Sequence, residues 1–277
     1  MRALCEPVLV GPANVLSAAP KGIRVVTTVR RACSVGEIRP EHGLAALDAA
    51  RKAIEGALAG EYHAVVAAPH SETAIHAAGL EFDGYPSFVA RTAGLPPEDG
   101  VLMLCFAHEG REVRIAHVTL HSSVCDALKL ISKEKVLKTI RAVDAALKKL
   151  GIEQPRIAVS GVNPHASGGE EQAVIGPAIE EARQSVLVDG PIGADTLIQR
   201  AAYDAYVVML HDQGHVAAKL LAPNRAAALT IGTPVLFSSV AHGAAFDIAG
   251  QNRADPAAMV EAITRLVTQR RRASATQ

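Results

Sequence analysis

The amino-acid sequence predicts an α/β protein built around a mostly parallel β-sheet. Short apolar runs rich in Val, Ile and Leu alternate with longer segments whose apolar residues recur at helical spacing. Hydrophobic residues make up 49% of the 277 positions, whereas aromatic residues make up 3% and Trp is absent. A composition dominated by small aliphatic residues suits parallel strands covered by helices better than an all-β sandwich.

The charge balance and the cysteine pattern argue against several classes of partner. Lys and Arg together number 28, as do Asp and Glu, so no basic stripe is available for nucleic acid or an anionic membrane. No apolar run is long enough for a transmembrane helix, and the first residues lack a signal-peptide pattern. No Cys-x-x-Cys pair occurs, so we expect a cytoplasmic protein with reduced thiols. The cysteines are Cys5, Cys33, Cys105 and Cys125.

In the first half of the chain, apolar runs predict three strands and helical periodicity predicts three helices. In the longest helix, Leu44, Leu47, Ile54 and Leu58 recur at helical spacing, and Gly60 is placed to end it. The expected strands span residues 7–11, 23–29 and 63–68. The expected helices span residues 13–19 and 41–59, with a third beginning at residue 88.

The second half continues the alternation after a predicted hairpin. Its two strands, 113–120 and 101–106, flank a turn that contains Gly110. Apolar residues at helical spacing predict a helix over 132–150, which Gly151 would end. The remaining expected elements are strands at 156–160, 205–210, 227–231 and 235–238, a Glu-rich helix ending near residue 183, and a helix over 256–268.

Three histidines, His121, His165 and His211, each follow a predicted apolar strand. Ligands of open α/β sheets bind at the carboxyl ends of the strands. Three imidazoles with positions left for water or substrate would make a catalytic site for a divalent transition metal. The alternative is chance placement, because the chain has 11 histidines and these three form no local metal-binding motif.

Two aspartates and a lysine are candidates for the same site. Asp195 and Asp212 could orient the imidazoles or position a substrate hydroxyl. Asp195 could instead be a helix N-cap, and Asp212 a turn acceptor. Lys219 lies two helical turns beyond His211 and could present its ammonium to the site, although a solvated surface lysine would look the same.

The segment from His242 to Gly250 is rich in small residues, which let a backbone approach a ligand closely. Its Asp247 could accept hydrogen bonds from ribose hydroxyls, as acidic residues do in NAD sites. A tight turn before a helix would have the same composition. No Gly-x-Gly-x-x-Gly pattern occurs, so a standard Rossmann site is not predicted.

The ordered motifs resemble those of the 4-hydroxythreonine-4-phosphate dehydrogenase family, which is itself similar to the isocitrate and isopropylmalate dehydrogenases. They are Asn163-Pro164-His165-Ala166, Gly193-Ala194-Asp195-Thr196, His211-Asp212-Gln213-Gly214 with Lys219, and the segment from His242 to Gly250. The resemblance implies two α/β/α domains, one of residues 1–85 plus 236–277 and one of residues 86–235 that carries the dimer interface.

The resemblance also implies the cofactors and the assembly. It implies a homodimer whose active sites are shared, with the third metal-binding histidine supplied by the neighbouring subunit. The metal ligands would be His121, His165 and His211, with zinc favoured over iron, manganese, cobalt or magnesium. NAD would be held by His242, Gly243, Ala245 and Asp247.

Departures from the family pattern bear on the substrate. The family loop Gly-His-Thr-Glu is replaced by Gly84-Tyr85-Pro86-Ser87, and Ala228 and Phe237 stand where the family has Asn and Arg. These groups cannot anchor a phosphate. The loop and the stretches 69–76, 117–121 and 219–224 resemble the branch that acts on cis-dihydrodiols of aromatic acids. The substrate residues would be Ser71, Tyr85, Lys219, Phe237 and Ser238.

That branch implies a metal- and NAD-dependent oxidative decarboxylation of a terephthalate-type dihydrodiol to a catechol such as protocatechuate. One alternative is a dehydrogenase of 4-hydroxythreonine 4-phosphate or another hydroxy acid. A second is an inactive metal- or ligand-binding homologue, because the family's opening Asp-Pro-x-Gly-Ile-Gly-Pro-Glu loop is missing from this sequence. In that case the first domain would lack its N-terminal strand and loop.

Overall fold

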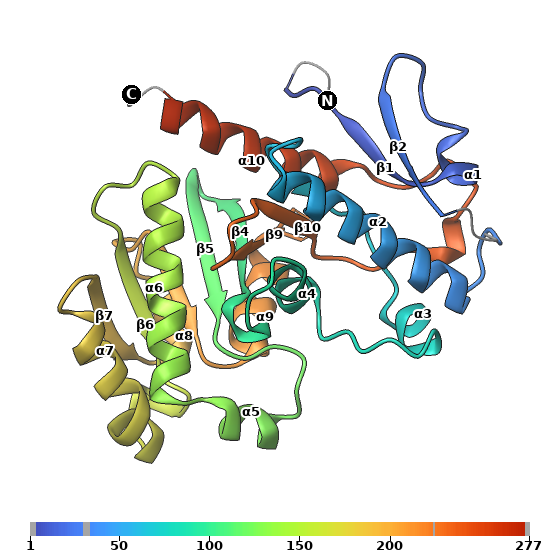
Figure 1. The fold of residues 1–277 in the computed structure, drawn as a ribbon. Helices are drawn as coiled ribbons and strands as arrows, with labels where there is room; N and C mark the ends of the chain where they lie inside the picture. The colour runs from blue at the N-terminus through green and yellow to red at the C-terminus, as the bar shows by residue number, and fades with distance from the viewer. Residues whose placement is uncertain (1–3, 30–33, 224, 275–277) are drawn as a thin grey trace.

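A computed structural model describes residues 4–29, 34–223 and 225–274, with side chains up to residue 267 (Figure 1). Cys33 and residue 224 of the stretch 219–224 lie outside the described residues. The strands are β1 (Val8–Pro12), β2 (Arg24–Thr28), β3 (Val65–Val66), β4 (Val101–His108), β5 (Arg111–His117), β6 (Arg156–Ser160), β7 (Leu187–Ile192), β8 (Ala205–Val208), β9 (Ala227–Ile231) and β10 (Phe237–Val240). The α-helices are α1 (Ala13–Leu16), α2 (Pro40–Leu58), α3 (Glu72–Ala77), α4 (Tyr85–Thr92), α5 (Val124–Leu130), α6 (Lys133–Lys149), α7 (Gly176–Ala182), α8 (Ala194–Leu197), α9 (His211–Leu221) and α10 (Ala257–Ser274).

The described strands form an eight-stranded mixed sheet and a separate parallel pair, β1 and β2. The order in the large sheet is β3-β10-β9-β4-β5-β8-β6-β7. The run from β5 to β7 is parallel, as is β10 with β3, whereas β9 is antiparallel to both of its neighbours and β4 is antiparallel to β5. The prediction of an α/β fold with a mostly parallel sheet is confirmed.

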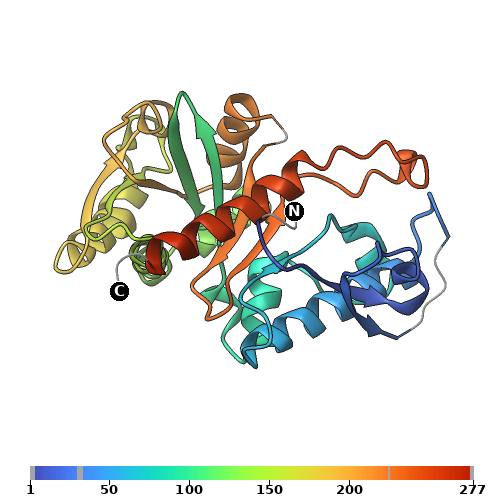
Figure 2. The same ribbon diagram turned by 90° about the horizontal axis from the view of Figure 1, so that it is seen from above.

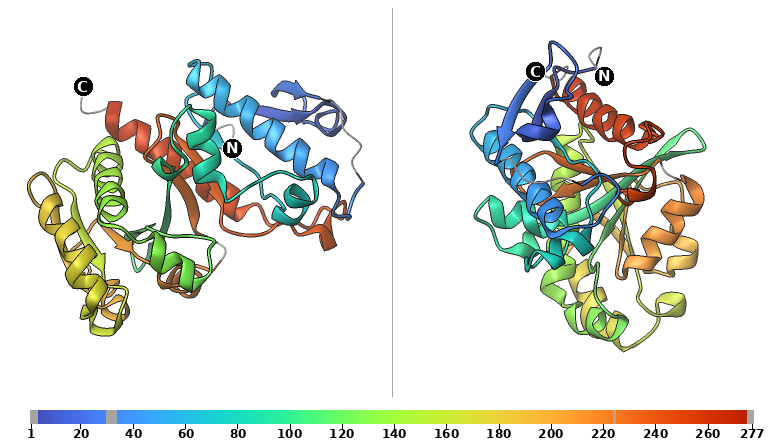
Figure 3. Two further views of the ribbon diagram at one scale, coloured as in Figure 1. Left: turned by 60° about the horizontal axis from the view of Figure 1, so that its bottom comes forward. Right: turned by 90° about the vertical axis from the view of Figure 1, so that its right-hand side faces the viewer.

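Helices cover both faces of the sheet because side chains alternate along each buried strand. In β8, Ala205 and Val207 join the core beneath α6, α7 and α10, whereas Tyr206 and Val208 join the core beneath α8 and α9. A third cluster packs α2, α3 and α4 against β3 and β10. Figure 1 shows α6 and α7 at the β7 end and α2 at the other, and Figure 3 shows α2 beside α4.

Helix α6 shows why the clearest sequence patterns gave accurate boundaries. Ser132 caps it, with Oγ accepting a hydrogen bond from the backbone N–H of Lys135 at 3.2 Å. The apolar side chains on one face are fully buried. Gly151 follows with φ of 85°, a left-handed conformation that glycine adopts without strain.

Several predicted boundaries are wrong. Strand β3 is only two residues long, and α4 begins at Tyr85 rather than residue 88, because Gly84 with φ of 112° turns the chain into a helix with Pro86 in its first turn. Strand β5 ends at His117 rather than residue 120, so His121 lies in the loop beyond it. Helix α5 and strand β7 were not predicted.

The expected domain division, residues 1–85 plus 236–277 and residues 86–235, stays a prediction. Strand β10 of the first part pairs with β9 of the second, so one sheet runs through both. Among the described residues, no helix is both long and apolar enough to cross a membrane.

Candidate active site at the ends of β6 and β8

The strand β8 delivers His211 to the first position of α9. The Gln213 Oε1 accepts hydrogen bonds from the backbone N–H groups of Met209 at 2.9 Å and Leu210 at 3.0 Å, which caps the helix start. Gly214 packs against the buried His117, since a Cβ there would lie 2.3 Å from His117 Nε2. The residue types after His211 are therefore set by packing as well as by chemistry.

Four imidazoles gather where α9 meets the end of β5. The His211 and His215 rings stack with centroids 3.8 Å apart, and His121 lies 5.4 Å from His211. His117 lies beneath them, 4.7 Å from His215. Burial, reinforced by the neighbouring imidazoles, lowers the pKa of His117 well below its usual range and that of His215 to about 4. Both rings therefore stay neutral near pH 7.

Asp212 is placed to orient His211. Its exposed carboxylate accepts a hydrogen bond from His211 Nδ1 at 2.7 Å, and this bond lowers the Asp212 pKa. A carboxylate on one imidazole nitrogen fixes the tautomer and leaves the other nitrogen free to act as a ligand. This placement is compatible with the predicted role of Asp212.

Asp195 lies in a different place, in the first turn of α8. The alternative that it is a helix N-cap is wrong, because Gly193 occupies that position. A Cβ at Gly193 would lie 2.8 Å from Asp195 Oδ1 and 3.8 Å from His165 Cα. Asp195 therefore belongs with the His165 segment, and its catalytic role stays a prediction.

His165 lies in the loop that follows β6, not directly after the strand as predicted. It adopts a left-handed conformation with φ of 59°, as does Ala166 with φ of 51°. Across the described part of the chain, His165 makes no ring contact with another histidine, and no three His, Cys, Asp or Glu side chains are arranged to hold a metal. The chain thus brings together two of the three predicted ligands.

The predictions missed a carboxylate and three further histidines near the site. Glu72 Oε1 lies 3.8 Å from His121 Nδ1 and 3.9 Å from His70 Nε2. His215 could have been found from its position one helical turn after His211. The buried His117 gave no such signal, because it lies in a run of predicted strand.

The predicted substrate residues near β10 are mostly interior. Tyr85 is 5% exposed, with its ring centroid 4.6 Å from that of His70 and 5.0 Å from that of Phe237. Phe237 and Ser238 are fully buried. Ser71 caps α3, its Oγ accepting from the Ala74 N–H at 3.2 Å. Direct contact of these four residues with a substrate stays a prediction.

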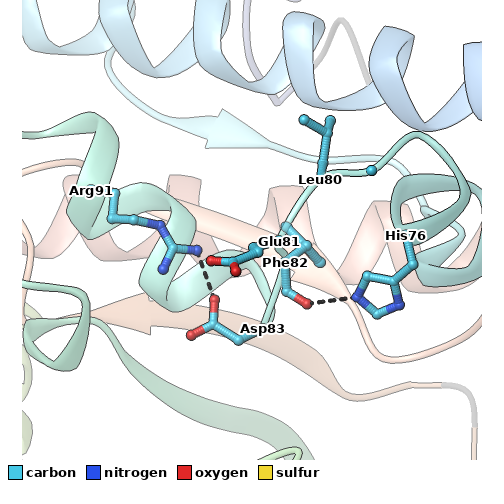
Figure 4. A pocket seen from close by; sticks show the side chains of 7 residues that line it. His76, Leu80, Glu81, Phe82, Asp83 and Arg91 are labelled. Atoms are coloured by element: carbon cyan, nitrogen blue, oxygen red, sulfur yellow. Dashed lines mark hydrogen bonds and ion pairs between the residues drawn. The ribbon is translucent and has the colours of Figure 1, made fainter.

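The loop before α4 is held by polar side chains around a cavity of about 570 Å³ (Figure 4). The Arg91 guanidinium donates to Asp83 at 2.7 Å, and His76 Nε2 lies 3.1 Å from the Phe82 carbonyl oxygen. These contacts pin the loop that leads into Tyr85.

A second pocket, of about 330 Å³, adjoins the imidazole cluster. Lys219 and His215 line it from α9, and His242 lines it from the segment after β10. The predicted substrate lysine and a predicted cofactor residue thus meet in one pocket. Its other lining residues are apolar: Leu104, Ala218, Ala222, Pro223, Ala226 and Ala241.

The segment 241–250 projects beyond β10 before the chain returns along α10 (Figure 2). Ala245 is left-handed with φ of 47°, and Phe246–Ile248, which contains Asp247, forms one 3-10 turn. The Phe246 ring stacks on His42, with centroids 6.2 Å apart. A Cβ on Gly243 would meet no atom within 4 Å, so its backbone is open to a ligand.

Comparison with known proteins gives the site its context. Residues 5–266 match the family described as "Pyridoxal phosphate biosynthetic protein PdxA". A 1,2-dihydroxy-3,5-cyclohexadiene-1,4-dicarboxylate dehydrogenase from a Comamonas species is 46% identical over 240 residues, 84% of this chain and 75% of that protein.

Two solved structures superpose on the chain. A terephthalate 1,2-cis-dihydrodiol dehydrogenase from Burkholderia xenovorans LB400 has 39% identity and a TM-score of 0.68, covering 95% of this chain and 89% of that one. A 4-hydroxythreonine-4-phosphate dehydrogenase from Klebsiella pneumoniae has 31% identity and a TM-score of 0.76, covering 89% and 77%.

These relatives define the class of the protein as a dehydrogenase, an oxidoreductase that acts on the CH–OH group of a small molecule. The chain belongs to the PdxA family.

Proposed function

We propose that the protein oxidises a cis-dihydrodiol of an aromatic dicarboxylic acid with NAD and releases CO2, giving a catechol such as protocatechuate. The two relatives named for such diols support this substrate class. The observation that carries the proposal is the pocket beside Lys219, whose apolar lining suits a ring and whose ammonium suits a carboxylate.

The positions expected to hold a phosphate argue for the same substrate class. Ala228 and Phe237 are buried and offer neither a charge nor a hydrogen-bond donor. A phosphorylated substrate would therefore lack these anchors.

The proposed reaction balances as an oxidation followed by loss of CO2. A hydride passes from the carbinol carbon to NAD and the hydroxyl proton is released, which leaves a ketone β to a ring carboxylate. The carbon–carboxylate bond then breaks, CO2 leaves, and the electron pair forms an enol that is the aromatic catechol once its oxygen is protonated. We assign proton handling to Asp212 and Asp195 and the holding of a carboxylate to Lys219.

A divalent metal, with zinc favoured, would be held by His121, His165 and His211 and would supply a Lewis acid for the hydroxyl oxygen. These donors fit a divalent metal, because the His121 and His211 ring centroids lie 5.4 Å apart and Asp212 occupies only one nitrogen of His211. His165 does not join them within one chain. We therefore propose a homodimer in which a second copy supplies the third imidazole.

The segment that carries His242, Gly243, Ala245 and Asp247 would hold NAD. His242 lines both this segment and the Lys219 pocket, so a cofactor bound here would adjoin the substrate. The open space at Gly243 allows close approach of a ligand to the backbone, and the Asp247 carboxylate suits ribose hydroxyls.

The test is NADH formation together with trapped CO2 when zinc-loaded protein acts on terephthalate cis-dihydrodiol. We expect both products in equal amounts. The second candidate function is oxidation of 4-hydroxythreonine 4-phosphate, favoured by the 31% identity to the Klebsiella structure. If NADH forms from 4-hydroxythreonine 4-phosphate but not from the diol, the second function replaces the first. If neither substrate yields NADH, the result favours a protein that only binds a metal or ligand.

A further inference from the structure

The side chain of Gln213 joins the two segments that carry His165 and His211. Its Oε1 accepts from the backbone of Met209 and Leu210 at the start of α9. Its Nε2 donates to the carbonyl oxygen of Gly161, the first residue after β6, at 3.0 Å. The Gln213 amide supplies both an acceptor and a donor, whereas a carboxylate has no donor and an apolar side chain has neither, so neither Glu nor an apolar residue could make both connections.

The buried side chain of Glu171 organises the His165 segment from within. The residue is 4% exposed, and its Oε1 accepts from the backbone N–H groups of Val162 at 2.7 Å and Asn163 at 2.8 Å. Its Oε2 accepts from Asn163 Nδ2 at 2.8 Å. These bonds outweigh the opposing effect of burial and lower the pKa of Glu171, so the carboxylate is charged at neutral pH.

The conformation that these bonds hold is a costly one. His165 and Ala166 are consecutive non-glycine residues with positive φ, a strained conformation that persists only where neighbouring contacts impose it. The Glu171 bonds fix the residues directly before this turn. The Gln213 bond fixes the point where the loop leaves the sheet.

We propose that Glu171 and Gln213 are positioning residues that hold the His165 segment in its left-handed conformation and in fixed register with the helix that begins at His211. Their importance for turnover rests on the proposed function, in which those histidines serve the active site. The backbone restraint itself is independent of any substrate.

Hydrogen exchange of the metal-free full chain tests the restraint directly. In Glu171→Ala, peptides over 161–168 should exchange at least about tenfold faster, because two backbone N–H groups lose their acceptor. Gln213→Ala should speed exchange both there and over 209–215. Peptides from α6 should be unchanged in both variants, which also shows that the fold is retained.

The chain offers matched controls for both positions. Among the described residues, the Glu170 side chain accepts a hydrogen bond from Asn163 Nδ2 and from no backbone N–H group, so Glu170→Ala should leave exchange within about twofold of the parent. Gln172 is exposed, and Gln172→Ala should behave likewise. If Glu171→Ala does not fold, Glu171→Gln keeps one acceptor but sets its NH2 group against that of Asn163, and it should give an intermediate rate.

A kinetic readout separates positioning from simple structural support. On the diol, Glu171→Ala and Gln213→Ala should lower kcat at least about tenfold while the KM for NAD stays within about twofold, since the NAD segment is elsewhere. Unchanged exchange over 161–168 would overturn the proposal, as would faster exchange with an unchanged kcat. If the parent protein oxidises no diol, the proposed function fails while exchange still decides the restraint.

Discussion

The segments that follow β6 and β8 begin as neighbours and end differently. The two strands are parallel and hydrogen-bonded, so the segments that follow them leave the sheet at the same edge. After β8 the chain enters α9 at His211, which joins a cluster of imidazoles. After β6 it makes a left-handed loop that carries His165 beside α8. Adjacent strand ends therefore do not by themselves bring side chains together, because the path of the next few residues decides where they lie.

The largest expected effect is that both segments are needed for turnover although they lie apart in one chain. His211→Ala and His165→Ala should each lower kcat for the diol more than about 100-fold, because each removes a proposed metal ligand. Steady-state NADH formation measures this. His63→Ala, at an exposed position outside the site, is the control and should be near parental. An active His165→Ala would remove the β6 segment from the site.

Substituting the two aspartates compares the segments further, with smaller expected losses of kcat. Asp212→Asn should lower kcat about 10- to 100-fold, because Asp212 bonds directly to His211 Nδ1. Asp195→Asn should cost less, since the described residues show no bond from it to an imidazole of the cluster. A larger loss for Asp195→Asn would assign the proton-handling role to the β6 side.

Glycine substitutions compare how tightly each segment is packed. Gly214→Ala would place a Cβ 2.3 Å from His117 Nε2, and Gly161→Ala would place one 2.7 Å from Ala166 Cα. Each should lower the free energy of unfolding by about 1–3 kcal/mol, as measured by urea denaturation. Gly169→Ala meets nothing within 4 Å and should be nearly neutral. Neutral behaviour of Gly161→Ala would mean that the β6 loop is loosely held.

The smallest expected effects distinguish the segments by pH. The pKa of His215 falls from 6.5 to about 4 on folding, so the unfolded chain binds the extra proton and stability is lost as pH drops from 6.5 towards 4. The pKa of Glu171 is lowered from 4.5, so its contribution is complete above 4.5 and is lost below that pH.

Thermal unfolding of metal-free protein across this range checks both signs. His215→Gln should make the loss of stability between pH 6.5 and pH 4 less steep, with His117 still contributing, and Glu171→Gln should do the same for the loss below pH 4.5. Asp144 pairs with Lys148 on α6 and offers a control. Asp144→Asn should leave unchanged the pH dependence of stability that His215 and Glu171 contribute. A His215→Gln profile identical to that of the parent would contradict the buried neutral imidazole.

The sequence predicted the elements whose patterns are local. Strand β6 has the predicted bounds because it is a short apolar run, and α6 lies within one residue of its predicted bounds at each end because its apolar stripe is long and capped. Strand β5 was overextended because residues 118–119 are apolar or β-branched, and they still donate hydrogen bonds to the backbone of Val208 and Met209 after the strand ends. Helix α5 was missed because it is only seven residues long, too short for the helical spacing of Val124, Ala127 and Leu128 to stand out.

The site was less predictable because long-range contacts shape it. The placement of His211 and Asp212 beside each other could be anticipated from one strand end, whereas their roles and that of Lys219 stay predictions. The bonds from Gln213 to Gly161 and from Glu171 to Val162 depend on how separate segments meet, which no local pattern encodes. The placement of His165 away from the cluster has the same origin.

The central claim is that His165 of a second copy completes the site at His121 and His211. Subunit complementation tests this claim most directly. His165→Ala and His211→Ala proteins, each inactive alone, are mixed in equal amounts under conditions that allow subunit exchange. A shared site predicts recovery to about one quarter of parental NADH formation, because half the dimers are mixed and each holds one intact site. No recovery, despite exchange shown by mass spectrometry of the mixed dimer, would contradict the account.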